Sequence, residues 1–145
     1  MGTFVVTDTR ENARSLSGVE SANRQTVLDY YRAMVEKLTF EHLQPFLNDD
    51  YAEHNPAVPA GDLEALRGFC DSVLAVEFSN IFVDVQQTIV DGAFVLLRIA
   101  GRLRPDDPTD MVMELFRLRD GKISEHWEVV GPSGTRVIES VVSKH

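Results

Sequence analysis

The chain has 145 residues, and its 14 basic and 23 acidic residues give a net charge of −9. This length is typical of one domain, and 43% hydrophobic with 26% charged residues is an ordinary globular composition. Binding to nucleic acid or to an anionic membrane surface needs a footprint of lysine and arginine, so the acidic balance argues against both kinds of partner.

The sequence carries no sign of export or of membrane insertion. The one cysteine, Cys70, allows no intrachain disulfide, and no run of about eighteen apolar residues could span a bilayer. The first residues lack the basic start and apolar core of a secretory signal. We therefore expect a cytoplasmic protein.

Helical patterns fill the first half of the chain. Residues 1–20 show no sustained period and are expected to form a mobile arm or to dock on a partner subunit. From Ser21, an apolar stripe at helical spacing predicts a first helix, built on Val27, Tyr31, Met34, Val35 and Leu38. Because Tyr30 and Tyr31 are adjacent, we expect only Tyr31 to point inward.

The region after this helix combines turn residues with a third helix. Thr39 is expected to cap a short second helix through Leu47, weakened by Pro45. Asn48-Asp49-Asp50 is typical of a turn, and residues 51–61 of a loop. Asp62 is a good cap for the third helix, in which Cys70 belongs to the buried stripe.

Alternating polar and apolar residues predict four strands in the second half. They cover about 80–89, Phe94–Leu103, Met111–Arg119 and Ile123–Val130, with turns at Asp91-Gly92 and Asp120-Gly121. In the first strand, Gln87 falls on the same face as Val85 and Ile89. The proline-rich and aspartate-rich loop within residues 99–109 suggests a lid, and the tail could add a short strand through Val137 and Ile138.

Helices followed by an antiparallel meander predict an α+β domain. We expect it to span residues 21–132, between an arm at 1–20 and a tail at 133–145. About three helices would pack on one face of a strongly curved, mostly antiparallel sheet. Such a sheet encloses an apolar pocket beneath the helices.

Polar residues on apolar strand faces are the best site candidates. Glu114 shares a face with apolar neighbours, so it must enter a cavity, find a partner or hold a proton. His126 and Glu128 share one face of the next strand, and Trp127 takes the other. Arg98 lies on a face with Phe94, Leu96 and Ala100. The alternatives are a cross-sheet ion pair of Glu114 with Arg98, a core histidine at His126 and a solvated edge residue at Glu128.

The segment Tyr51-Ala52-Glu53-His54-Asn55-Pro56 places a phenol, an imidazole and an amide within one predicted loop. Its alternative is a structural loop whose side chains bond to the local backbone. The four histidines have no paired metal-ligand spacing, so we expect no metal, although His54 and His126 with a carboxylate remain a possible composite site.

Two motifs together resemble the SnoaL-like polyketide cyclase family, within the nuclear-transport-factor-two-like superfamily. They are Tyr51-x-x-His54-Asn55-Pro56 and the stretch from Glu114-Leu-Phe-Arg through Asp120-Gly-Lys-Ile-Ser-Glu-His126-Trp-Glu128. The resemblance covers about residues 22–132. It implies a cone-shaped α+β barrel with a deep apolar pocket, a homodimer formed through the sheet, and ring closure by aldol chemistry without a cofactor.

Two departures from the family pattern stand out. The family commonly has aspartate where this chain has Glu114, and often where it has Glu128. Each carboxylate here therefore stands one methylene further from the backbone. A common family histidine is replaced in the region of Leu97 and Arg98. A cation inside the pocket there would favour an enolate or a carboxylate on the substrate.

The main functional hypothesis is a cofactor-free cyclase or isomerase that acts on a hydrophobic, carbonyl-bearing polyketide-type molecule. Glu114 or Glu128 would remove a proton next to a carbonyl, and His126 would exchange a proton with the oxygen. The expected substrate-binding residues are Tyr31, Tyr51, His54, Asn55, Arg98 and Phe116. The alternatives are a Diels–Alder-type closure driven by shape and desolvation, and a non-enzymatic binding or dimerisation module.

Overall fold

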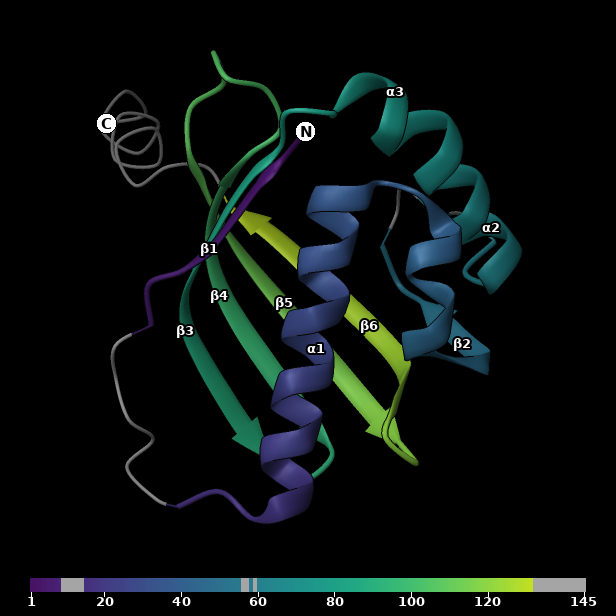
Figure 1. Ribbon diagram of the computed structural model, residues 1–145, viewed down its shortest axis with the longest axis vertical. Helices are drawn as coiled ribbons and strands as arrows, with labels where there is room; N and C mark the ends of the chain where they lie inside the picture. Colours follow the sequence, from purple (N-terminus) through teal and green to yellow (C-terminus); the bar gives the residue numbers. More distant parts are fainter. Residues whose placement is uncertain (9–14, 56–57, 59, 132–145) are drawn as a thin grey trace, which may run out of the picture.

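A computed structural model describes residues 1–8, 15–55, 58 and 60–131 (Figure 1). Its six strands form one open sheet in the order β1-β3-β4-β5-β6-β2. The strands are β1 (Thr3–Val6), β2 (Leu47–Glu53), β3 (Phe82–Asp91), β4 (Phe94–Arg102), β5 (Asp110–Arg119) and β6 (Lys122–Gly131). The helical segments are α1 (Gly18–Lys37), the 3₁₀ turns η1 (Phe40–His42) and η2 (Gln44–Phe46), α2 (Leu63–Phe69), the π-helical turn η3 (Cys70–Leu74) and α3 (Ala75–Glu77).

The predicted α+β class is confirmed, and the helices cover one face of a curved sheet. Strands β3 to β6 form the expected antiparallel meander. The edge strands are parallel to their neighbours, β1 to β3 and β2 to β6, so the sheet is mixed. Parallel pairing joins segments that are distant in the chain, and no local pattern announces it.

Helix α1 begins earlier than the stripe of apolar residues suggests. Ser17 is its N-cap: the Ser17 side chain accepts a hydrogen bond from the backbone N–H of Glu20, and the Glu20 carboxylate accepts one from the backbone N–H of Ser17. This capping box satisfies two backbone donors that would otherwise be open at the helix start. The helix ends at Lys37, and its C-cap residue Leu38 adopts a left-handed conformation with φ of 63°.

Two expectations about the first half of the chain are wrong. Within the arm predicted for residues 1–20, Thr3–Val6 is an edge strand that places Phe4 in the core, 9% exposed. Leu47–Glu53 is strand β2, where a helix end, a turn and a loop were expected. Turn-forming residues misled the prediction, because long-range pairing with β6 overrides a weak local preference.

A β-bulge in β3 changes which side chains face the helices. The pairing register with β4 shifts between Val85 and Gln87. After the shift Thr88 and Val90 point inward, while Ile89 is 48% exposed. The prediction that Val85, Gln87 and Ile89 share a face is therefore wrong, because a bulge interrupts the two-residue alternation.

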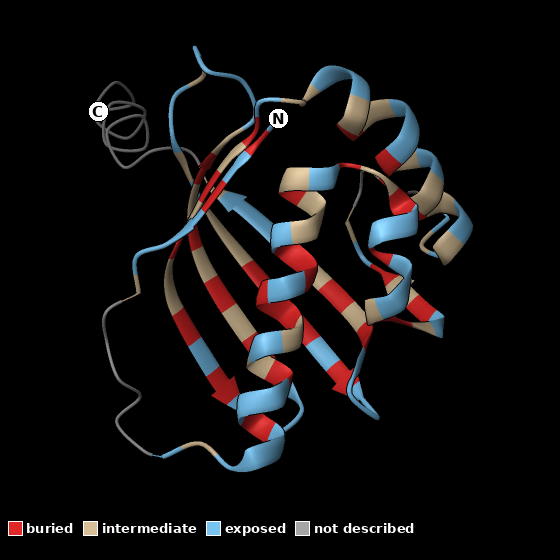
Figure 2. Cartoon of the chain, in the orientation of Figure 1, coloured by how far each residue is buried: buried red, intermediate tan, exposed pale blue. Residues whose placement is uncertain are grey.

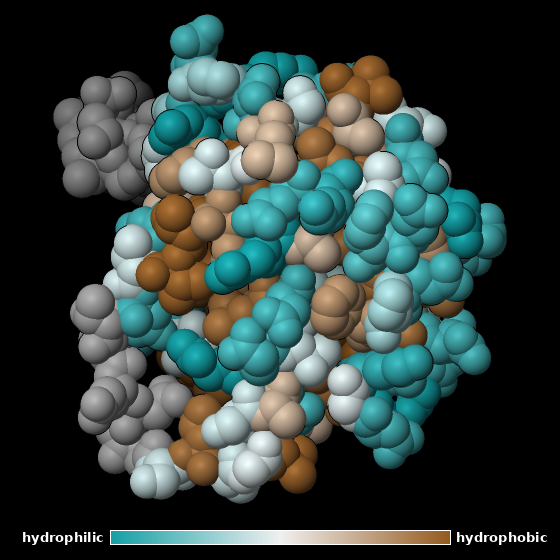
Figure 3. Space-filling model, viewed as in Figure 1, coloured by the Kyte–Doolittle hydropathy of each residue, from teal (hydrophilic) through white to brown (hydrophobic). Residues whose placement is uncertain are grey.

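The core lies between the helices and the sheet. Buried positions follow the sheet-facing side of α1 and the inner face of the strands (Figure 2). Tyr30 and Tyr31 both pack edge-to-face on Phe116, with ring centroids 5.9 and 6.5 Å away. Hydrophilic side chains cover the outward side of α1 (Figure 3).

The remaining expectations about organisation are tested only in part. In the described part of the chain, no helix is long and apolar enough to cross a bilayer. The tail predicted at 133–145, with its short strand at 137 and 138, lies outside the described residues.

Candidate active site

A cavity of about 650 Å³ lies between the helices and the inner face of the sheet. This volume falls within the range of small-molecule pockets. One wall comes from α2, η3 and α3, including Phe69, Leu74 and Phe78, and the opposite wall comes from β3 to β6. Most lining side chains are apolar, so the few polar ones among them determine the chemistry.

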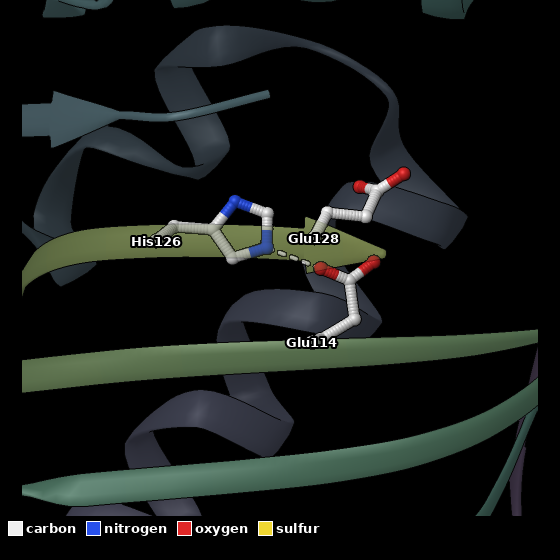
Figure 4. Close-up of side chains that lie close together, drawn as sticks. All are labelled: Glu114, His126 and Glu128. Atoms are coloured by element: carbon white, nitrogen blue, oxygen red, sulfur yellow. Dashed lines mark hydrogen bonds and ion pairs between the residues drawn. The ribbon is translucent and has the colours of Figure 1, made fainter. Parts of the chain in front are cut away.

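The polar part of the wall is built around His126. Its Nε2 contacts Glu114 Oε2, and its Nδ1 lies 2.8 and 2.7 Å from the two carboxylate oxygens of Glu53. The relative exposures are 6% for His126, 1% for Glu114 and 7% for Glu53. Glu128 extends from the same strand as His126 and lies beside Glu114 (Figure 4).

Strand pairing brings these residues together. In the β5–β6 register Glu114 pairs with Glu128 and Phe116 with His126. Because side chains alternate along a strand, all four point to the face that the helices cover. The parallel β2–β6 register then pairs Glu53 with His126 and completes the group.

His126 is held as an imidazolium. Burial by itself would lower its pKa, but the charge of Glu114 and the hydrogen bonds to Glu114 and Glu53 outweigh burial and raise the pKa to about 10. Both ring nitrogens then donate hydrogen bonds to carboxylates. In this arrangement neither nitrogen is left for a substrate.

Two tyrosines donate to the carboxylates of this group. The Tyr31 hydroxyl donates to Glu114 Oε1 over 2.8 Å, and the Tyr51 hydroxyl donates to Glu53 Oε2 over 2.5 Å. Burial and neighbouring negative charge raise the pKa of both phenols well above 10.0. They therefore stay protonated and remain hydrogen-bond donors at any physiological pH.

Glu128 is the carboxyl of this group that is least enclosed by protein partners. Burial and the nearby charge of Glu114 raise its pKa to about 8, against an ordinary value near 4.5. Its Oε2 accepts a hydrogen bond from the Asn55 side chain over 3.2 Å. Both Asn55 and Glu128 line the cavity. Glu128 is thus a proton-carrying carboxyl at the wall of an apolar cavity.

The structure brings together five of the nine predicted site residues along the cavity wall: Tyr31, Asn55, Glu114, His126 and Glu128. Two more lie directly behind this wall. Phe116 stacks beneath the His126 ring with centroids 4.6 Å apart, and Tyr51 supports Glu53.

Arg98 lies outside the cavity, contrary to the expectation that it binds substrate. It shares a face with Leu96 and Ala100 as predicted, but this is the face away from the helices. Its guanidinium donates to Gln86 and Gln87 over 2.9 and 3.3 Å. The alternative of a cross-sheet ion pair between Glu114 and Arg98 is therefore wrong, since the guanidinium of Arg98 bonds to the two glutamines instead.

His54 also faces outward, so it is not at the mouth of the pocket. Its Nε2 lies 2.8 Å from Glu125, and its ring stacks on Trp127 with centroids 4.9 Å apart. Adjacent residues of an extended chain point to opposite sides. Glu53 faces the cavity, so the next residue, His54, faces away from it.

Sequence reasoning missed Glu53 and Tyr30. Glu53 lies inside the quoted motif, and its spacing of two from Tyr51 would have placed both on one face had the segment been taken as a strand. Tyr30 is 3% exposed and lines the cavity together with Tyr31. Adjacent helical residues lie about 100° apart, so both fit within the broad buried side of α1.

Among the residues that the structure describes, Glu114, His126 and Glu128 form a group that could hold a metal ion, since each offers a ligand atom within 4.8 Å of the others. A metal needs the lone pair of a neutral imidazole. The carboxylates on both sides of His126 keep a proton on each ring nitrogen. This donor set therefore favours proton chemistry over metal binding.

Comparison with known proteins finds a family and a fold. A family model described as a SnoaL-like domain matches residues 27–126, well over half of the chain. TsrD from Streptomyces laurentii is 20% identical, with a TM-score of 0.61 over 80% of this chain and 91% of that chain. Wild-type IdmH from Streptomyces antibioticus, a candidate polyketide cyclase, is 21% identical, with a TM-score of 0.61 over 82% of this chain and 97% of that chain.

A third solved structure shares the fold at a lower sequence identity. A candidate ketosteroid isomerase from Kribbella flavida is 13% identical, with a TM-score of 0.63 over 79% of this chain and 81% of that chain. At these identities the likeness establishes the shared fold alone. Comparison with curated protein sequences finds no match.

Proposed function

The chain belongs to the SnoaL-like domain family, and within it we propose that this protein is a cofactor-free cyclase or isomerase of a hydrophobic, carbonyl-bearing, polyketide-type molecule. The observation that carries the proposal is Glu128, whose pKa is raised to about 8 at the wall of an apolar cavity. A proton-transfer group works best when its pKa lies near the working pH.

Glu128 carries the proton in the proposed reaction. Its ionised carboxylate removes a proton from the carbon next to a substrate carbonyl, and the C–H electrons move into an enolate. In a ring closure, the enolate carbon attacks a second carbonyl of the same molecule. The new alkoxide oxygen then takes the proton back from Glu128, so the enzyme returns to its starting state and atoms balance.

The other polar residues position Glu128 and set its basicity. The charge of Glu114 contributes to the high pKa of Glu128, and a more basic carboxylate removes a carbon-bound proton more readily. The ion pairs of His126 with Glu114 and Glu53 fix that charge. Asn55 donates a hydrogen bond to one oxygen of Glu128 and so limits how this carboxyl can turn.

Proton exchange on a simple ketone tests the proposal without the natural substrate. We expect the protein to accelerate hydrogen–deuterium exchange at the methyl group of 4-acetylbiphenyl, measured by mass spectrometry in D₂O. Glu128→Gln keeps the shape and removes the base, so the rate should fall about 10²–10⁴-fold. Glu125→Gln, on the outer side of the same strand, is the matched control and should keep the full rate.

The pH dependence adds a second test of the same role. The exchange rate should rise with pH up to about 8, as Glu128 ionises, and then level off. Full activity in Glu128→Gln, together with a flat pH profile, would contradict the proposal and show that another group removes the proton. Ligand binding without any exchange would favour a binding module.

We also propose that two copies pair through the outer face of the sheet. The register places Leu96, Leu115 and Trp127 side by side on this face, and Met111 and Val129 beside them are 48% and 67% exposed. An apolar sheet face of this kind is typical of an interaction surface. Light scattering should show a dimer that Val129→Asp disrupts, whereas Val19→Asp, at an α1 position 70% exposed, should not.

A further inference from the structure

One position in the wall of the cavity has no side chain. Gly101 of β4 lines the cavity, on the same inner face of the strand as Ile99 and the buried Leu97. A Cβ at this position would lie 3.2 Å from the Phe82 carbonyl oxygen and 3.5 Å from Ile99 Cγ2. Apart from the two flanking residues, no other atom of the described chain would lie within 4 Å of it. The position therefore borders open space in the cavity.

The backbone conformation does not require a glycine here. Gly61, Gly92 and Gly121 have positive φ angles, whereas Gly101 does not. A glycine inside a strand weakens the strand and often marks a place where a ligand or another backbone approaches closely. These two causes predict different effects of an added Cβ. Crowding against the Phe82 oxygen would lower stability, whereas filling space that a ligand uses would lower affinity.

The Gly101 recess, the space over Gly101 that Val83, Ile99 and Leu103 border, is mostly apolar. Val83 is the partner of Gly101 in β3, and Ile99 and Leu103 lie two positions before and after it in the chain. On the β5 side its partner is Asp110, which already has an interaction within the protein. An alkyl or aryl group placed in this recess would leave water for apolar surroundings, which favours binding.

The Gly101 recess lies well away from Glu128 in the same cavity. The strand register pairs Glu128 with Glu114, and Glu114 with Leu97. Gly101 follows Leu97 by four positions, which is about 13 Å along a strand. Ile99, between them on the same face, also lines the cavity. A ligand whose carbonyl lies beside Glu128 can therefore extend over an apolar wall into the recess.

Building on the function proposed above, we propose that Gly101 determines the specificity of the enzyme for long substrates. The substrate is an elongated carbonyl compound whose reacting carbonyl lies beside Glu128. Its remote end is an alkyl or aryl group that fills the Gly101 recess. A side chain at position 101 shortens the molecule that the cavity accepts.

Two ketones that differ only at the remote end test this role. They are 4-acetylbiphenyl and 4-acetyl-4′-propylbiphenyl, and calorimetry gives each dissociation constant. We expect the wild type to bind the propyl ketone at least about tenfold more tightly, because the propyl group is buried in the recess. Gly101→Val should bring the two constants within about twofold of each other, and Gly101→Ala should reduce the ratio in part. Ala100→Val, on the outer face of the same strand, is the control and should keep the full ratio.

Three results would overturn the inference: equal affinity of the wild type for the two ketones, no binding of either ketone, or an unchanged ratio in the Gly101 variants. Thermal unfolding tests the other cause of the glycine. If crowding by the Phe82 oxygen is that cause, Gly101→Ala unfolds at a lower temperature and keeps the full ratio. Gly101→Ala adds the least volume, so it carries the test if Gly101→Val does not fold.

The binding ratio and the proposed reaction fail independently. The ratio needs no turnover, so a Glu128→Gln variant that exchanges at the full rate would contradict the reaction and leave the ratio standing. Equal affinity for the two ketones, with exchange that still depends on Glu128, would contradict only the role of Gly101.

Discussion

Two histidine–glutamate pairs lie on opposite faces of the sheet, where β6 runs beside β2 and the residue that follows β2. On the inner face His126 Nδ1 is 2.7 Å from Glu53, and on the outer face His54 Nε2 is 2.8 Å from Glu125. The side chains are 8% and 3% exposed in the inner pair, but 42% and 19% exposed in the outer pair. The chemistry and the distance match, so burial is the difference between the pairs.

Burial separates the two pairs in what they can do. In the interior, charges are poorly screened, and each added partner changes the pKa of its neighbours. The inner pair continues through Glu114 to Glu128 and Tyr31 and produces a carboxyl that titrates at about 8. Among the described residues, the outer pair adds Arg117 and a stacked Trp127, within reach of water. A surface pair of this kind contributes little.

The largest expected contrast is the cost of removing each histidine. His126→Ala leaves two buried carboxylates without their cation, so the free energy of unfolding should fall by about 3–5 kcal/mol. His54→Ala should cost less than about 1 kcal/mol. Urea unfolding at pH 7 measures both. Similar losses in the two variants would break the comparison, since burial would then not separate the pairs.

The pH dependence of stability should come from the inner group. The pKa of Glu128 rises from 4.5 to about 8 on folding, and that of His126 from 6.5 to about 10. Both groups bind protons more tightly when folded. Each group therefore contributes its full stabilisation below its unfolded pKa. This contribution to the free energy of unfolding is lost as pH rises from the unfolded to the folded pKa of the group, by at most about 1.4 kcal/mol per pH unit.

The substitution Glu128→Gln removes one of these two titrating groups and so tests its share of the pH dependence. Between about pH 5 and 6, Glu128 contributes to the slope and His126 is protonated in both states, so the variant should show a flatter slope than the wild type. Urea unfolding at several pH values measures the slope, and His54→Ala should leave it unchanged. Parallel slopes for the wild type and Glu128→Gln would contradict the raised pKa.

A smaller effect is expected from the hydroxyl that supports Glu114. Tyr31→Phe removes the hydrogen bond to Glu114 Oε1 and keeps the ring packed on Phe116. The unfolding free energy should fall by about 1–3 kcal/mol, because a buried carboxylate loses a donor. Ketone exchange should slow by less than in Glu128→Gln. An exchange rate equal to that of the wild type would show that Tyr31 has no part in positioning.

The smallest effect is expected on the outer face. Glu125→Gln weakens the contacts with His54 and with Arg117, which lies 2.5 Å away, but both partners are well exposed. The unfolding free energy should change by less than about 1 kcal/mol. A larger loss would show that the outer cluster contributes as much as a buried one and would break the comparison.

Local pattern was enough to predict much of the site. The two-residue alternation placed Glu114, His126 and Glu128 correctly on strand faces, and Asp91-Gly92 located a hairpin turn. These features depend on neighbours within a few positions, where sequence and geometry are tightly coupled. The α+β class followed from the order of helical and alternating segments.

Tertiary structure decided the rest. Strand β4 is apolar on both faces, so its sequence could not tell that Arg98 points outward while Leu97 is buried. Glu53 joined the site only because β2 pairs in parallel with β6, more than seventy positions away. In β5 and β6 the sequence by itself determined which side chains share a face, whereas the bulge in β3 did so there. Long-range pairing and helix packing determined which face is buried, because only the assembled fold removes one of two similar faces from water.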